Sequence, residues 1–201
     1  MTSIQKITPS TLPSAPLDID MPLIRRMANG ESQALEMLMD RHMKKIHGTA
    51  YRMLGDQMQA EDVTQMVFLN IWNLAPKWAQ GQARVLSYLY KVCTHRCLDI
   101  LRKKKESLPG ELPDQIDQQP SALNLIENRE TAERVQSAIA QLPDNQRAAI
   151  NLFYYEHQSL KMAAETLEIS PSAFESLLRR ARKSLKSHLT TDPASPMEPL
   201  S

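Results

Sequence analysis

The chain has 201 residues, of which 42% are hydrophobic, 23% are charged and only five are glycine. This length allows one domain of ordinary size or two small ones, and the abundance of Leu, Ala, Met, Gln, Arg and Lys in the middle of the chain favours an all-α fold. Two cysteines argue against a disulfide framework. Because there is also no apolar run of membrane-spanning length and no signal-peptide pattern, we expect a cytoplasmic protein.

The net charge is only +1, but the charges are unevenly distributed along the chain. Residues 84–105 contain seven basic residues and one acid, and residues 173–189 contain five and one. Residues 106–133 between them contain seven acids and one basic residue. One basic segment usually marks only a solvated helix face. Two such segments around an acidic connector are more typical of a protein that binds two separate stretches of a polyanion.

Proline-rich segments divide the chain into modules. Residues 1–17 and 190–201 are predicted to be disordered tails. Residues 106–120 contain three prolines, one glycine and four acids, a composition typical of a flexible acidic linker. This linker separates an N-terminal module, residues 18–105, from a C-terminal module, residues 121–189, and both have the size of a small domain.

Four helices are predicted for the N-terminal module from the spacing of its apolar residues, at residues 20–30, 32–54, 59–74 and 84–104. Asp20 and Ser32 are the candidate caps of the first two helices. Gly55 is expected to end the second helix, and the next helical segment starts again from Asp56. A loop with Lys77 and Trp78 precedes the fourth helix.

The two cysteines lie four residues apart on the fourth helix. Cys93 and Cys97 share a face with Leu89 and other apolar residues, so we expect them to be buried and structural. His95 between them leaves a metal-binding or redox role as the alternative.

The C-terminal module is predicted to contain helices at residues 121–142, 144–155, 159–167 and 170–189. Asp144 and Ser159 are candidate caps. Ser170 is a candidate N-cap with Pro171 at the first helical position, which is a strong start signal. A short helix, a tight turn and a long basic helix together form the pattern of a helix-turn-helix unit.

The string from Ala60 to Trp72, AEDVTQMVFLNIW, resembles the polymerase-binding helix of the extracytoplasmic-function (ECF) sigma factors of bacteria. The resemblance covers about residues 20–105 and 121–189. It implies two small helical domains, a four-helix sigma domain 2 and a helix-turn-helix sigma domain 4. It also implies that this helix binds the clamp coiled coil of core RNA polymerase. The residues that would do so are Glu61, Asp62, Gln65, Phe68, Leu69 and Trp72. Trp72 could instead simply fill the core.

The strings YLYKV, from Tyr88, and DILRKK, from Asp99, resemble the family's helix for melting and recognising the downstream promoter element. Opening a duplex requires cations for the separated backbones and flat side chains for unstacked bases. The implied DNA-binding residues are Lys77, Trp78, Tyr88, Lys91, His95, Arg96, Arg102 and Lys103. The sequence departs from the family where Tyr88 replaces a Trp, Val85 a Phe and His95 an Asn.

The string LPDNQR, from Leu142, and the later RRAR, from Arg179, resemble the family's domain for the upstream promoter element. A recognition helix enters the major groove with its N-terminal residues. The implied DNA-binding residues are Ser170, Ser172, Ala173, Glu175, Ser176, Arg179, Arg180, Arg182 and Lys183. At the positions of Glu175 and Leu177 family members often have basic residues, and at the position of Glu168 they often have a glycine. The Glu175 carboxylate can accept a hydrogen bond from a cytosine amino group, so this residue would change the DNA sequence that the helix prefers.

The resemblance therefore predicts a sigma factor that directs promoter-specific initiation, for a stress or envelope-type response. Its expected partners are the clamp and flap of core polymerase, promoter DNA and an anti-sigma factor. Two alternatives remain: a sigma mimic that only binds an anti-sigma factor, and a DNA-binding regulator that works without polymerase. We expect no cofactor and no enzymatic activity, because the five histidines are scattered and there is no phosphate-binding glycine loop.

Overall fold

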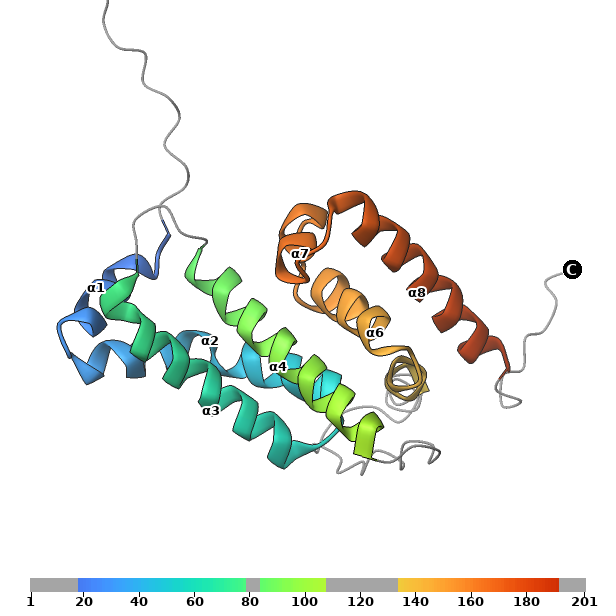
Figure 1. Cartoon of the computed structure of the whole chain (residues 1–201), viewed down its shortest axis with the longest axis horizontal. Helices are drawn as coiled ribbons and strands as arrows, with labels where there is room; N and C mark the ends of the chain where they lie inside the picture. The colour runs from blue at the N-terminus through green and yellow to red at the C-terminus, as the bar shows by residue number, and fades with distance from the viewer. Residues whose placement is uncertain (1–17, 79–83, 108–133, 192–201) are drawn as a thin grey trace, which may run out of the picture.

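The computed structural model describes residues 18–78, 84–107 and 134–191, and every regular element in these ranges is helical (Figure 1). The expectation of an all-α fold is confirmed. The predicted tails at 1–17 and 192–201, the linker from residue 108 onward and residues 121–133 lie outside the described residues. We refer to residues 18–107 as the N-terminal module and to residues 134–191 as the C-terminal module.

The N-terminal module contains the four predicted helices. They are α1 (Met21–Ala28), α2 (Ser32–Leu54), α3 (Gln57–Leu74) and α4 (Val85–Ser107), with the short 3₁₀ turn η1 (Ala75–Lys77) after α3. Gly55 ends α2 in a left-handed conformation, with φ of 71°, which favours glycine. The Asp56 carboxylate then accepts a hydrogen bond from the Gln59 amide at 2.8 Å and caps α3. The basic helix α4 ends two residues beyond the predicted domain boundary.

In the N-terminal module one predicted cap is wrong, and another lies at the predicted position without a side-chain capping bond. The N-cap of α2 is Glu31, and Ser32 is the first helical residue. Asp20 is the N-cap residue of α1, but its side chain makes no capping bond, because its buried carboxylate is used in tertiary contacts with α2. One oxygen lies 2.8 Å from His42 Nε2, and the other accepts from Arg41. These bonds hold the start of α1 against α2.

The core of the N-terminal module lies between α2, α3 and α4. Leu38, Val67 and Leu89 are fully buried there, and so are Cys93 and Cys97. A hydrogen bond with Cys97 and then burial raise the pKa of the Cys93 thiol well above its ordinary value. A thiol that stays protonated in an apolar core is unreactive, so burial supports the structural interpretation of this pair.

The C-terminal module contains a helical segment at residues 134–140, α6 (Asp144–Ile150), α7 (Leu160–Thr166) and α8 (Pro171–Thr191). The predicted helix at 144–155 is interrupted: α6 passes into η2 (Asn151–Tyr155), a π-helical turn. Asp144 is the first residue of α6 rather than its cap. The other two caps are confirmed, since Ser159 accepts from the Met162 amide and Ser170 from the Ala173 amide, at 3.3 and 3.2 Å.

The turn between α7 and α8 has the geometry of a helix-turn-helix unit. Glu168 adopts the left-handed conformation, with φ of 56°, at the position where the family often has glycine. Phe174, Leu178 and Ala181 on the inner face of α8 are buried. They pack in the same core as Leu152 and Ala163. The helix-turn-helix prediction is confirmed.

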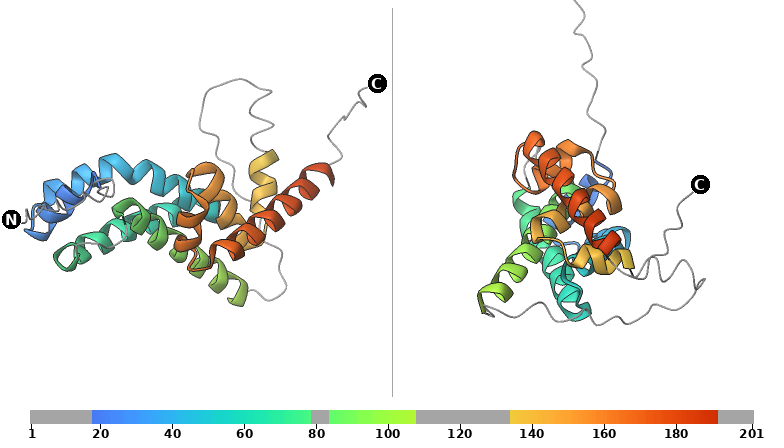
Figure 2. Two further views of the ribbon diagram at one scale, coloured as in Figure 1. Left: turned by 90° about the horizontal axis from the view of Figure 1, so that it is seen from above. Right: turned by 90° about the vertical axis from the view of Figure 1, so that its right-hand side faces the viewer.

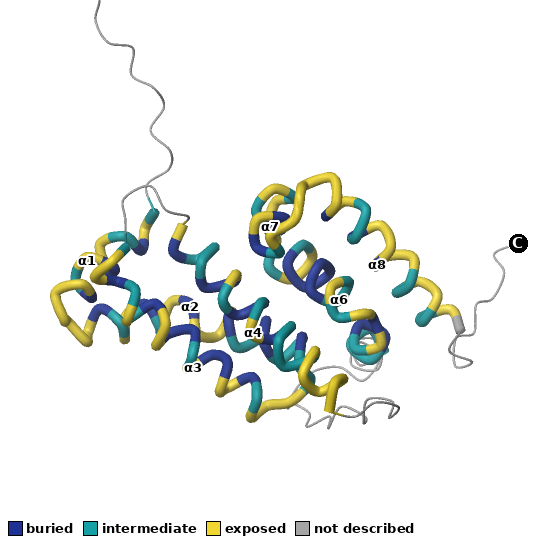
Figure 3. The backbone as a smooth tube through the Cα atoms, viewed as in Figure 1, coloured by how far each residue is buried: buried dark blue, intermediate teal, exposed yellow. Residues whose placement is uncertain are grey.

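The two modules pack directly against each other, a contact that the predicted flexible linker alone did not indicate. Figures 1 and 2 show α6 and α7 beside α4, and α4 contacts both of them. Polar bonds cross the boundary, including one of 2.6 Å from Arg147 to the Met53 carbonyl. Figure 3 shows buried residues on the inner sides of the helices in both modules, whereas the outer sides of α3 and α8 are exposed. Among the described helices none is long and apolar enough to cross a membrane.

Candidate protein and nucleic-acid interfaces

The outer face of α3 carries most of the predicted polymerase-binding residues. Asp62 and Gln65 are exposed, and Leu69 is 58% exposed although it is a large apolar residue. Trp72 is half-buried and packs on the core with one side, so its ring both fills the core and borders the surface. Glu61 is exposed and accepts a hydrogen bond from Gln57.

Phe68 does not belong to this surface. Its side chain is only 2% exposed and lies in the hydrophobic core, so direct contact with a partner is excluded in this structure. Met58, by contrast, is 74% exposed and lies one turn before Asp62. It extends the apolar surface of α3 toward its N-terminus. The sequence analysis missed this residue, although its spacing continues the series of Asp62, Gln65 and Leu69 and could have identified it.

The start of α4 brings two predicted aromatic residues together. The rings of Trp78 and Tyr88 meet edge to face, with centroids 5.2 Å apart and an interplanar angle of 84°, a favourable aromatic geometry. Burial raises the pKa of Tyr88, and the nearby Lys91 ammonium partly offsets this. The two rings form an apolar corner beside the Lys91 side chain.

The other predicted cations of the downstream site lie along the exposed part of the N-terminal module. Lys77, Arg96, Arg102 and Lys103 are all exposed. Arg102 pairs with Asp99 at 2.9 Å, three residues earlier on α4. Exposed ion pairs of this kind contribute little to stability.

Lys91 and His95 are occupied by the C-terminal module. Lys91 Nζ lies 2.7 Å from the Glu168 carboxylate, and His95 Nε2 lies 2.9 Å from the Thr166 carbonyl oxygen. Because a carbonyl oxygen can only accept, Nε2 must carry a proton in this contact. Two of the predicted downstream DNA contacts are therefore engaged by the end of α7 and the turn that follows it.

The ion pair with Lys91 predicts a measurable shift at Glu168. Its hydrogen bond and charge attraction to Lys91, and the charge of His95, lower the pKa of Glu168 below the ordinary 4.5. Because the pKa of Glu168 is lower in the folded protein than in the unfolded chain, its ion pair with Lys91 stabilises the contact between the two modules above pH 4.5. This stabilisation is lost as the pH falls through the pKa of Glu168 in the folded protein. NMR titration of the side chain should show the low pKa, and Lys91→Met should return it toward 4.5. An unchanged pKa in the variant would show that the bridge does not form in solution.

The predicted DNA-reading face of α8 is open. Ser172, Ala173 and Glu175 are exposed and Ser176 is half-buried, and the same outer side continues through the remaining exposed positions, Ser170, Arg179, Arg180, Arg182 and Lys183. The Arg182 guanidinium also lies over the Phe153 and Tyr154 rings, at 5.8 and 5.5 Å. It is therefore held in place by cation–π contact and differs from its neighbours on α8.

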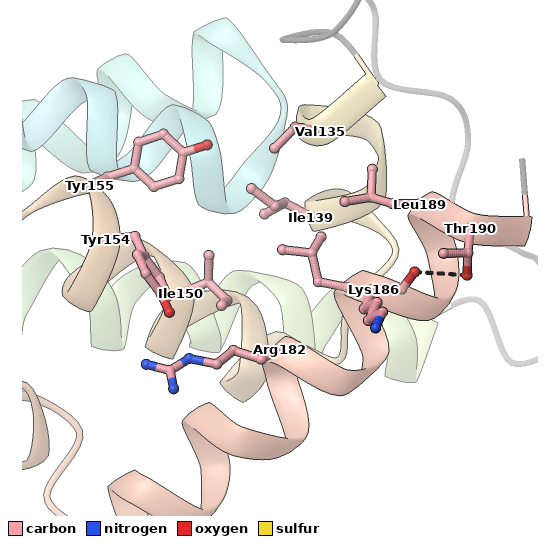
Figure 4. Close-up of a pocket in the computed structure, with 10 residues that line it drawn as sticks. Val135, Ile139, Ile150, Tyr154, Tyr155, Arg182, Lys186, Leu189 and Thr190 are labelled. Carbon is pink, nitrogen blue, oxygen red and sulfur yellow. Dashed lines mark hydrogen bonds between the residues drawn. The ribbon is translucent and has the colours of Figure 1, made fainter. Parts of the chain in front are cut away.

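An apolar groove of about 410 Å³ lies between α8, the α6–η2 segment and the helical segment at residues 134–140 (Figure 4). Ile139, Ile150 and Leu189 are among the apolar residues that line it, and Arg182 and Lys186 add positive charge. The sequence analysis did not identify this groove, because its walls come from three segments that only the tertiary fold brings together.

An exposed basic helix in a helix-turn-helix unit on one module and a cationic helix on the other are typical of a helical DNA-binding protein. The Sigma-70 region 2 family model matches residues 38–107, and the Sigma-70 region 4 model matches residues 132–185. Together these segments span most of the two modules. The chain belongs to the sigma-70 family of bacterial transcription initiation factors, in the ECF group.

Relatives across nearly the whole length carry the same description. The ECF RNA polymerase sigma factor SigK of Mycobacterium sp. (strain KMS) is 26% identical over 188 residues, covering 90% of this chain and 95% of that protein. ECF RNA polymerase sigma factor SigW of Bacillus subtilis (strain 168) is 26% identical over 181 residues, covering 83% and 94%.

Two solved structures share the fold. The structure of CnrH in complex with the cytosolic domain of CnrY has a TM-score of 0.65 at 22% identity, and covers 86% of this chain and 98% of CnrH. The sigma factor RpoE from Bartonella quintana, in complex with the anti-sigma factor NepR, has a TM-score of 0.64 at 18% identity, and covers 78% and 97%.

Proposed function

We propose that this sigma factor docks on core RNA polymerase through the exposed face of α3 and contacts promoter DNA through α4 and α8. The observation that carries the proposal is the position of the three surfaces on separate helices. The α3 face combines the exposed Leu69 and Met58 with Asp62 and Gln65. An apolar centre with polar neighbours is the usual composition of a protein interface, and a coiled coil of the polymerase clamp is the partner that the family resemblance implies.

The two DNA surfaces have different chemistry. The cations of α4 and the Trp78–Tyr88 corner suit a separated strand, because they combine phosphate attraction with a flat apolar support. The exposed outer side of α8 suits the major groove of intact duplex, where Glu175 would meet base edges and Arg179 and Arg180 would meet phosphates. With about five phosphate contacts per module, each worth about 0.9 in the salt slope, one module alone would bind weakly at physiological salt.

The groove in the C-terminal module is the candidate contact for the polymerase flap. Its apolar walls and the charges of Arg182 and Lys186 would suit an apolar segment with acidic neighbours. An anti-sigma factor would compete for the same surfaces, and the RpoE relative is described in complex with one. We place this activity in the cytoplasm, where polymerase acts.

Run-off transcription tests this function directly. Core polymerase, genomic fragments and the full chain should together give transcripts that core polymerase alone does not give. At limiting protein concentration, Arg179→Ala combined with Arg180→Ala should reduce these transcripts and make their salt dependence shallower than that of wild type, because each lost phosphate contact lowers the salt slope. If no fragment gives a new transcript although the chain binds core polymerase, the function is wrong and a sigma mimic becomes the better account. DNA binding without any polymerase binding would instead favour an independent regulator.

A further inference from the structure

The start of α4 is capped by a carboxylate from a distant part of the chain. The Tyr88 amide donates to the Arg84 carbonyl at 3.0 Å, which makes Arg84 the N-cap residue, and an arginine side chain cannot accept a hydrogen bond. The first turn of α4 also contains no acidic residue. Instead, the Val85 amide donates to Asp18 Oδ2 at 2.6 Å, across 67 residues of sequence. The helix thus obtains from the tertiary structure an acceptor that is usually supplied locally.

Asp18 is itself held in place by the residues that follow it. The Asp20 amide donates to Asp18 Oδ1 at 3.0 Å, so each oxygen of the Asp18 carboxylate has its own partner. The Asp20 side chain is bonded in turn to Arg41 and His42 of α2. Residues 18–20 are therefore fixed to α2 before α1 begins, and they present the Asp18 carboxylate to α4.

The same N-terminal segment also holds the other side of the aromatic corner. Helix α1 packs against η1, which directly precedes Trp78. On the other side, Tyr88 lies one helical turn after Val85, so the bond to Asp18 fixes the turn from which the Tyr88 ring meets Trp78. The chain before and after the corner is thus attached to one structural unit, formed by residues 18–20 and α1.

Loss of the cap should act on this first turn and leave the rest of the helix in place. The Asp18 carboxylate satisfies one otherwise unpaired amide, and its negative charge is favourable at the N-terminus of a helix. Removal of a capping side chain typically lowers the population of the capped turn, relative to the frayed one, by about fivefold. Leu89 and Cys93 of α4 are fully buried and anchor the following turns, so the change would be confined to the aromatic corner.

We propose that Asp18 is a positioning residue for downstream promoter DNA, which caps α4 and thereby keeps the Tyr88 ring against Trp78 in the arrangement that receives an unstacked base. This inference rests on the proposed function, since the corner is the predicted contact with the separated strand. Asp18 acts through the Val85 amide and the first turn of α4, and the base meets only the two rings.

The test compares Asp18→Ala, which removes both acceptors, with Asp18→Asn, which keeps one acceptor oxygen and loses the charge. Asp40→Ala is the matched control, because Asp40 is an exposed carboxylate on α2. A second pair of variants moves the cap onto α4 itself. A serine in place of Arg84 can accept from the Ser87 amide and hold the same turn from within, so Asp18→Ala is also measured in the Arg84→Ser background.

The arrangement of the corner can be followed in the free chain by fluorescence. The chain has two tryptophans, so Trp72→Phe leaves Trp78 as the single emitter. Quenching of its emission by acrylamide should increase in Asp18→Ala, because the Tyr88 ring covers it for less of the time. The increase should be smaller in Asp18→Asn and absent in Asp40→Ala. Urea unfolding establishes that each variant is folded, and Asp18→Asn carries the test if Asp18→Ala does not fold.

The effect on DNA is measured with core polymerase and the full chain, in which Trp72 is retained. A promoter fragment from the run-off assay carries 2-aminopurine in its downstream element, and this base becomes fluorescent when it leaves the stack. Asp18→Ala should slow the increase in fluorescence by about fivefold, whereas affinity for core polymerase should not change. In the Arg84→Ser background the same substitution should slow it by less than about twofold, because the turn is already held.

Two results would overturn the inference. One is a folded Asp18→Ala variant with the quenching and the opening rate of wild type. The other is an equal loss in both backgrounds, which would show that Asp18 does not act through the first turn of α4. Failure of the proposed function has a different pattern, because the wild-type chain would then give no transcripts and no 2-aminopurine signal, while quenching of Trp78 would still respond to Asp18→Ala.

Discussion

Leu69→Arg should weaken binding to core polymerase by at least about 30-fold while changing the free energy of unfolding by less than about 0.5 kcal/mol. The side chain is 58% exposed in the free chain, so a long cation is accommodated there without disturbing the core. In the complex, Leu69 would lie at the apolar centre of the α3 face. An arginine at that position would have to be buried without a partner, which is far more costly than the loss of apolar area.

The measurement is a titration of labelled chain with core polymerase, accompanied by urea unfolding of the free chain. Met43→Arg is the matched control, since Met43 is also an exposed apolar residue but lies on α2. It should leave polymerase affinity unchanged. Equal affinities for Leu69→Arg and wild type would show that α3 does not dock through this face.

Phe68→Ala, one residue earlier on the same helix, should have the opposite effect and lower the free energy of unfolding by about 3–5 kcal/mol. Phe68 is among the largest fully buried side chains of the described chain. Its removal loses the transfer free energy of an aromatic ring and leaves a cavity that the surrounding α2, α3 and α4 can fill only in part. For a domain of this size a loss of this magnitude is a large fraction of the total stability.

Urea unfolding followed by circular dichroism measures this change, with Leu69→Ala as the neighbouring control, which should stay within about 0.5 kcal/mol of wild type. Where Phe68→Ala remains folded, its affinity for core polymerase should match that of wild type. A small stability loss combined with a large affinity loss would restore Phe68 to the polymerase surface and contradict its buried position.

Phe68 and Leu69 show how far helical spacing alone can predict which residues are exposed. Successive helical residues are separated by about 100° around the axis, so the exposed face around Asp62, Gln65 and Leu69 follows from spacing alone. Phe68 and Trp72 lie at the edge of that face. Whether an edge residue is covered depends on which helix packs beside it, and the structure buries Phe68 and leaves Trp72 half-buried.

Local chemistry determined several features of the C-terminal module. The hydroxyls of Ser159 and Ser170 cap helices as predicted, because capping involves only atoms within three residues. The left-handed conformation of Glu168 agrees with the family resemblance, because family members often have a glycine at this position. Asp20 lies at the predicted N-cap position but makes no side-chain capping bond, because Arg41 and His42, about 20 residues away, bind its carboxylate.

The sequence by itself determined the helices, the two modules and the cationic faces, since each depends on periodicity or composition within a short stretch of chain. Only the tertiary structure decided how the modules meet. Glu156 bonds to Thr49, Arg52 and Tyr90 across 107, 104 and 66 residues of sequence. A polar residue that pairs at such a distance leaves no local pattern, because its partner is selected by the packing of whole helices rather than by its neighbours in the chain.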